Sequence, residues 1–170
     1  NQFESDAYLY FGSLERTSEL DNSKYFIPFA PSEIISKKQD FEMQKGDVIT
    51  IYSKDQIELM IDAFIIKKEL TPDLSSLTSL FSYKKAGSVK ELIKRYTVNI
   101  EGAVSNPGAF VFGGMLNLKT LISISGGFNI LSDEEKISIT TPVMQDDNTI
   151  ALSELSVDAR NSELDKITIP

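Results

Sequence analysis

Residues 96–128 read YTVNIEGAVSNPGAFVFGGMLNLKTLISISGGF, and the rest of the chain is best understood from this segment. Its first part alternates apolar and polar residues, which is the period-two pattern of a half-buried strand. A type II turn is then indicated, because Pro107 fixes its own φ and Gly108 accepts a positive φ. We therefore expect a hairpin with strands at 97–104 and 109–112.

A short helix is expected after this hairpin, over residues 117–125. Asn117 can cap its N-terminus, and Gly126-Gly127 can end it in left-handed conformations that cost glycine least. Apolar residues at i, i+3 and i+4 would form its buried face: Leu118, Leu121 and Ile122. The segment is thus the start of a small α+β unit.

The order of these residues resembles the soluble-ligand-binding β-grasp (SLBB) family. It is most similar to the repeats of periplasmic polysaccharide export proteins of Gram-negative bacteria. The matching positions are Val98, Ile100, Gly102, Val104, Pro107, Gly108, Phe110, Leu121, Ile122, Gly126 and Gly127. Each glycine and proline of the pattern has a backbone role, so the resemblance implies structural positions and names no ligand-binding residue.

An internal repeat extends the resemblance. Gly46-Asp47 precedes the strand VITI, as the family's closing pattern requires, whereas the matching Asp165 follows leucine and departs from it. We therefore interpret residues 1–52 as the second half of a module, 53–95 as a helical connector, and 96–170 as a complete module. The expected fold is α+β, with β-grasp-like modules joined by an amphipathic helix.

The resemblance implies a non-enzymatic segment of an outer-membrane protein that exports capsule or exopolysaccharide. It implies a periplasmic location, with attachment to the outer membrane through parts outside this chain. The implied partners are further copies arranged in a ring, the polysaccharide polymer and an inner-membrane export protein. The alternative is a stand-alone module that binds a small soluble ligand such as a saccharide.

Composition excludes several other functions. The chain has 170 residues, a net charge of −8 and no basic cluster, so it is a poor candidate for binding nucleic acid. It has no histidine and no cysteine, which removes the Ser-His-Asp and Cys-His catalytic groups and the common zinc sites. We expect no enzymatic activity, no catalytic residue, no metal and no cofactor.

Three groups of residues could carry a site, but each has a simpler explanation. Asp133-Glu134-Glu135 and Asp146-Asp147 lack the spacing of a calcium loop and are better explained as solvated turns. Gly113-Gly114 has no Gly-Lys-Ser/Thr sequence after it and is better explained as a turn than as a phosphate loop. The aromatic residues could bind sugars or pack in a core: Tyr8, Tyr10, Tyr52, Phe110 and Phe112.

Other elements follow from local patterns. Capping boxes at Ser53/Gln56 and Ser88/Glu91 predict the starts of two helices. The first helix is expected to be amphipathic, with Ile57 on its apolar face, and to end near Leu70, before Pro72. Strands are expected at 8–11, 25–29, 48–52, 136–140, 149–152 and 166–170. The half-module leaves an apolar face without a partner, so we expect either self-association or packing of the first helix against residues 8–52.

Overall fold

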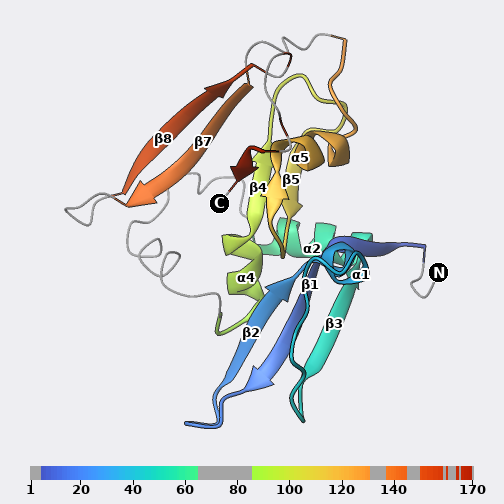
Figure 1. The fold of residues 1–170 in the computed structure, drawn as a ribbon, viewed down its shortest axis with the longest axis vertical. Coiled ribbons are helices and arrows are strands. Elements are labelled where there is room, and N and C mark those ends of the chain that lie inside the picture. Colours follow the sequence, from blue (N-terminus) through green and yellow to red (C-terminus); the bar gives the residue numbers. More distant parts are fainter. Residues whose placement is uncertain are drawn as a thin grey trace. The chain divides into compact units, whose positions relative to one another are not determined.

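The computed structural model describes residues 5–64, 86–130, 137–144, 150–158, 160, 164 and 166–169. It shows an α+β protein built from small antiparallel sheets and short helices (Figure 1). The chain divides into two compact units. Among the described residues, the first unit holds 5–64, 86–98 and 109–114, and the second holds the remainder.

The first unit contains a three-stranded antiparallel sheet with the order β2-β1-β3. Its strands are β1 (Ala7–Thr17), β2 (Lys24–Phe29) and β3 (Val48–Ser53). The expected strands at 25–29 and 48–52 are confirmed, and β2 is an edge strand, as Pro28 requires. β1 is longer than expected because its polar residues up to Thr17 pair with β2.

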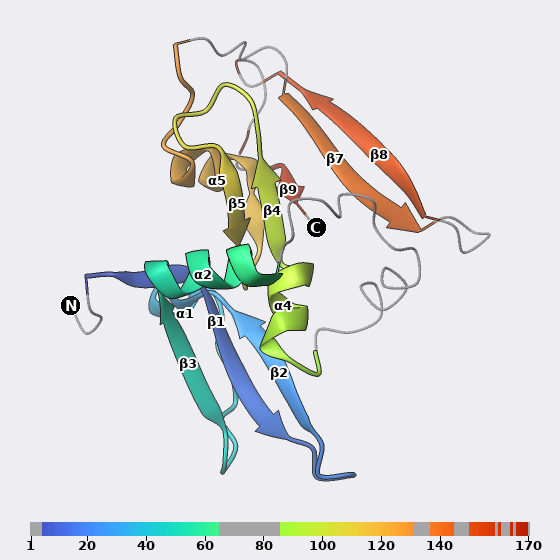
Figure 2. The ribbon, with the colours of Figure 1, turned by 180° about the vertical axis from the view of Figure 1, so that it is seen from behind.

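Helices α2 (Lys54–Phe64) and α4 (Val89–Arg95) pack with this sheet, and α1 (Pro31–Ile35) follows β2 (Figure 2). The core of this unit is formed by Tyr8, Phe11, Ile57, Ala86, Leu92, Ile93 and Val111. Ile57 is only 2% exposed in this cluster, which confirms that the first amphipathic helix packs against residues 8–52. Its expected continuation beyond residue 64 lies outside the described residues.

Hydrogen bonds at the helix ends confirm most of the expected caps. The Gln56 N–H donates to Ser53 Oγ at 3.2 Å, and the Ser53 N–H donates to Gln56 Oε1 at 3.0 Å. At α4 only half of the box forms. The Glu91 N–H donates to Ser88 Oγ, but the Glu91 carboxylate accepts from the Gly87 N–H instead of closing the box.

The expected hairpin is present in shortened form. β4 (Thr97–Ile100) pairs with β5 (Gly108–Val111), so the first strand ends four residues before the expected Val104. Gly102 turns the chain with a φ of +92°, and the Val104 N–H then donates to the Gly102 carbonyl at 3.0 Å. The residues that follow form hydrogen bonds with a later segment, which removes them from the hairpin.

The second unit contains α5 (Leu118–Ile124), β6 (Leu116–Asn117), β7 (Ile137–Met144), β8 (Ile150–Val157) and β9 (Thr168–Ile169). The expected helix over 117–125 is confirmed, with Asn117 Oδ1 accepting from the Thr120 N–H at 2.8 Å. β7 and β8 form an antiparallel hairpin, and β6 pairs with β9. The strands expected at 136–140 and 149–152 are therefore longer than predicted, and the last is shorter.

None of the helices in the described parts of the chain is long and apolar enough to cross a lipid bilayer.

Candidate functional site

The two glycines after α5 form a complete Schellman cap. The Gly127 N–H donates to the Ile122 carbonyl at 2.8 Å, and the Gly126 N–H donates to the Ser123 carbonyl at 3.1 Å. Gly126 has a φ of +81° and Gly127 a φ of +82°. These are the hydrogen bonds of this motif, and Gly126 is its left-handed residue, so the predicted role of the glycines in ending the helix is confirmed.

A strap of four residues, 103–106, is bound to this cap. The Ser105 N–H donates to the Gly127 carbonyl at 3.0 Å, and the Asn106 N–H donates to the Ser125 carbonyl at 2.8 Å. The Asn129 N–H donates to the Ala103 carbonyl at 3.0 Å. Gly126 lies so close to the strap that an added Cβ would come within 2.9 Å of Ser105 Cβ. The two glycine-containing parts of the sequence pattern therefore meet in the second unit.

The predicted type II turn at Asn106–Ala109 is not formed. Gly108 begins β5 with a φ of +157°, whereas the third position of a type II turn needs a φ of about +80°. The left-handed conformation is instead at Gly102, six residues earlier. The amides of Ser105 and Asn106 are held by the cap after α5, so β4 and β5 are joined by a loop that runs through the strap and not by a tight turn at Pro107-Gly108.

The apolar positions of the pattern serve packing. Ile100 and Val104 are each 9% exposed, while Val98 and Phe110 are half-buried. Leu121 of α5 is buried as well, and Val104 forms an isolated bridge with Phe128 beyond the cap. Pro107 immediately precedes β5.

Gly46 and Asp47 form the turn that leads into β3. Gly46 has a φ of +95°, and one Asp47 oxygen accepts from the Gln44 N–H at 2.8 Å. Arg16 of β1 holds both carboxylate oxygens, with donor–acceptor distances of 2.9 Å from Nε and 2.7 Å from Nη2. These hydrogen bonds keep the pKa of Asp47 at about 2, and they raise the pKa of Arg16. The matching Asp165 lies outside the described residues.

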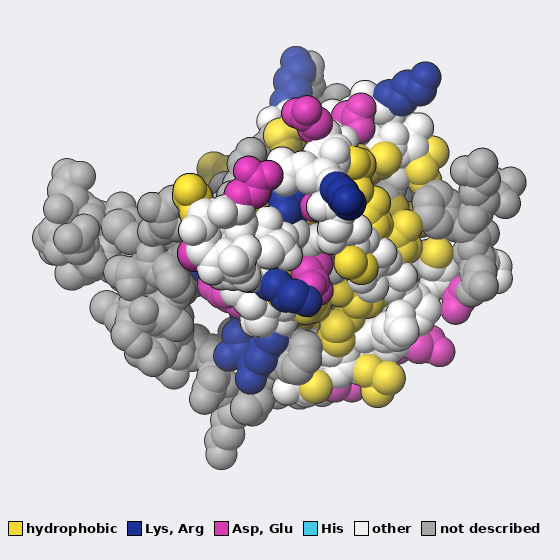
Figure 3. Space-filling model, turned by 90° about the horizontal axis from the view of Figure 1, so that it is seen from below, with side chains coloured by type: hydrophobic (Ala, Val, Ile, Leu, Met, Phe, Trp, Pro, Cys, Tyr) yellow, Lys and Arg dark blue, Asp and Glu magenta, His cyan; other side chains and the backbone are white. Residues whose placement is uncertain are grey.

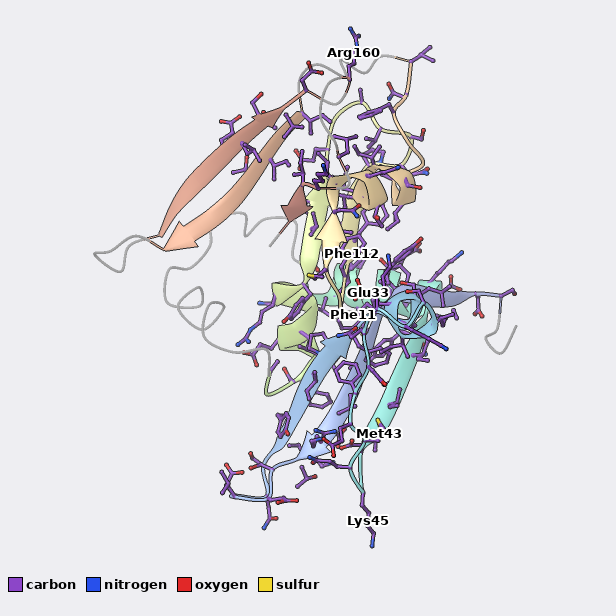
Figure 4. The ribbon with its side chains drawn as sticks, viewed as in Figure 1. Phe11, Glu33, Met43, Lys45, Phe112 and Arg160 are labelled. Carbon is purple, nitrogen blue, oxygen red and sulfur yellow. The ribbon has the colours of Figure 1, made fainter. Side chains whose placement is uncertain are left out.

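Several of the aromatic side chains that could bind sugars pack against other side chains instead. Tyr8 is 9% exposed and donates its hydroxyl proton to the Val111 carbonyl at 3.1 Å, and burial raises its pKa. Phe112 is 5% exposed and contacts both Tyr10 and Phe110, with ring centroids 6.0 and 6.5 Å away. Phe112 and Phe11, labelled in Figure 4, both belong to the first unit.

Tyr52 is half-buried and also has a structural role. Its ring stacks on Phe11 with centroids 5.8 Å apart, and its hydroxyl lies 2.8 Å from Ser13 Oγ. Ser13 is only 2% exposed, so this hydrogen bond satisfies a buried hydroxyl. These aromatic side chains therefore contribute to core packing more than to an open ligand-binding surface.

Gly113 and Gly114 have a role that their sequence does not reveal. A Cβ at Gly113 would lie 2.2 Å from the Phe29 carbonyl oxygen, and a Cβ at Gly114 would lie 2.4 Å from Glu33 Oε2. The Gly113 N–H donates to the Tyr10 carbonyl at 2.8 Å. Gly113 allows the chain to pass against the backbone of Phe29 at the end of β2, and Gly114 allows it to pass against the Glu33 side chain of α1. The proximity of Phe29 could not be read from spacing.

The acidic clusters at 133–135 and 146–147 fall outside the described residues. Within the described parts of the chain, no group of three or more acidic side chains is placed to hold a metal ion. The comparisons with known proteins give no further guide, since no family model, no curated protein and no solved structure matches this chain.

Proposed function

We propose that this chain is a periplasmic segment of an outer-membrane protein that exports polysaccharide, and that it acts as a structural part of a ring-shaped conduit. In this proposal the fold comprises β-grasp-like modules, and the positions of the sequence pattern maintain their shape without taking part in chemistry. The partners are further copies of the protein, the polymer and an inner-membrane export protein.

The observation that carries the proposal is the strap bound to the cap of α5. Gly126 is required there on two grounds, since its φ is +81° and the strap leaves no room for a Cβ. Gly127 and Gly102 also have positive φ values. A pattern whose glycines serve backbone contacts of this kind favours a repeated scaffold module over a catalytic site.

Disruption of the gene in its native cell tests the proposal. We expect loss of polysaccharide from the cell surface while the polymer still accumulates inside the envelope, because synthesis would continue and export would stop. Expression of the intact gene from a plasmid should restore surface polymer. Unchanged surface polysaccharide, or loss of polymer from every compartment, would contradict an export role.

Titration of the purified chain separates the alternative function. For a conduit segment we expect no saturable binding of short saccharides below roughly millimolar concentration. A dissociation constant in the micromolar range for one defined small ligand, which corresponds to about −8 kcal/mol, would instead identify a stand-alone binding module.

A further inference from the structure

The two edge strands of the first unit's sheet differ in how well they are protected from pairing with another strand. On the β2 edge, Phe26 exchanges two backbone hydrogen bonds with Ala86, with N···O distances of 2.8 and 3.1 Å. β2 also carries Pro28, which lacks an N–H, and Lys24, and both are residues that discourage strand addition. On the β3 edge, no strand in the described parts of the chain pairs with the outer side.

β3 is also unusually apolar for an exposed edge. Val48 is 52% exposed, Ile49 is 51% exposed and Ile51 is 36% exposed. The run Val48–Tyr52 contains no charge, no proline and no glycine, and its residues have high strand propensity. Hydrophobic side chains gather in a band on the face seen in Figure 3. Bare backbone groups beside such side chains form a template for another strand.

We propose that β3 pairs antiparallel with β3 of a second copy of this chain, across a two-fold axis at Thr50. Such a contact uses the same surface on both copies and closes at two chains. It joins two three-stranded sheets into one of six strands, and it pairs the outward-facing N–H and C=O groups of both edges. This inference does not depend on an export function, and the two-fold contact is separate from any contact between neighbours in the proposed ring.

The register follows from which residues come together. With the axis at Thr50, Ile49 of one copy lies opposite Ile51 of the other. Shifting the axis to Ile49 would bring the charged Asp47 of one copy opposite the apolar Ile51 of the other, which is a poor cross-strand pair. Shifting it to Ile51 would bring Asp47 towards Asp55, where like charges repel.

Charge at the ends of β3 favours the same register. Lys45 lies in the turn before β3 and Asp55 in the first turn of α2, and both are exposed. Figure 4 shows Lys45 extending from the tip of that turn. With the axis at Thr50, Lys45 of each copy lies at the end of the paired strands where α2 of the other copy begins. Asp55 is there, beside Lys54 at the first position of that helix, and an attraction between Lys45 and Asp55 at each end would make the edge complementary to itself.

Sedimentation equilibrium of the 170-residue chain over a concentration series tests the pairing. The contact is small, so we expect a monomer–dimer equilibrium with a dissociation constant of about 1–100 μM. Thr50→Lys would place two like charges opposite each other on the axis and should weaken the dimer at least roughly tenfold. Leu20→Lys is the matched control, because Leu20 is 98% exposed in the β1–β2 loop and away from this edge. It should leave the dimer unchanged.

Charge reversal tests the direction of the strands. Lys45→Asp alone and Asp55→Lys alone should each weaken the dimer several-fold, and the two together should restore it. A chain that stays monomeric up to about 1 mM overturns the proposal. So does a dimer that is insensitive to Thr50→Lys, or one that the double charge reversal does not restore.

Discussion

Replacing Gly126 by alanine should destabilise the second unit considerably more than the same change at Gly127. Both residues have nearly equal positive φ values, so each substitution costs about 1 kcal/mol for placing an L-residue in the left-handed region. Only Gly126 is crowded. Its added Cβ would lie 2.6 Å from Asn106 Nδ2 and 2.9 Å from Ser105 Cβ, whereas a Cβ at Gly127 meets nothing within 4 Å.

The additional cost at Gly126 follows from what must move. Ser105 Cβ is attached directly to the backbone of the strap, so relief of the contact displaces the amides of Ser105 and Asn106. Their two hydrogen bonds to the cap are then weakened, at about 1 kcal/mol each. We therefore expect a loss of about 3 kcal/mol for Gly126→Ala against about 1 kcal/mol for Gly127→Ala.

Urea unfolding followed by circular dichroism measures this difference. With a slope of about 2 kcal/mol/M, a gap of about 2 kcal/mol separates the midpoints of the two variants by about 1 M. Hydrogen exchange gives a local check, because the Ser105 and Asn106 amides should lose protection only in Gly126→Ala. Equal midpoints, or equal protection of the strap amides in both variants, would refute the close contact between strap and cap.

A second substitution identifies the atom responsible. Asn106→Ala removes Nδ2 from the contact but leaves Ser105 Cβ in place. Combined with Gly126→Ala, it should recover only a minor part of the lost stability. Full recovery would mean that the amide side chain alone causes the clash and that the strap backbone does not move.

Three further predictions concern the first unit. The pairing of Asp47 with Arg16 depresses the folded-state pKa of the carboxyl to about 2. The stabilisation from this pair should therefore be complete above about pH 4 and lost as the pH falls towards about 2. The difference in melting temperature between wild type and Asp47→Asn should shrink over that range. Ile57→Asp should cost on the order of 3–5 kcal/mol because it buries a charge, while Leu59→Asp on the exposed side of α2 should stay within about 0.5 kcal/mol, as urea unfolding can show. Gly113→Ala should lower the free energy of unfolding by about 1–3 kcal/mol in the same assay, since its Cβ would meet the Phe29 backbone and not a mobile side chain. An unchanged urea midpoint would contradict the close contact between Gly113 and Phe29.

The elements that sequence reasoning predicted well are those whose information is local. The caps at Ser53 and Asn117 lie within three residues of the amides they bind, and the two glycines after α5 complete their hydrogen bonds within that helix. Such contacts can be read from spacing alone. The α+β class followed in the same way from alternating and helical periods.

The elements that it missed depend on distant partners. Period two continued to Val104, but the strap binds residues about twenty positions later, so the strand ends at Ile100. The sequence pattern includes Asp47, yet its partner Arg16 lies 31 residues earlier on another strand. Neither contact leaves a signal in local spacing, because each arises only once the sheet and the helix are packed.

The division of the chain into two units has a consequence for how the protein can be cut. In the described parts of the chain, the backbone passes from the first unit to the second after Val98, back to the first after Gly108 and again to the second after Gly114. Neither unit is therefore a continuous segment of sequence. A protease that cleaves once cannot release either of them whole, and a gene fragment with a single boundary cannot encode either of them whole. A recombination event that moves one unit intact would have to carry the interleaved segment from Asn99 to Gly114 together with the residues on both sides of it.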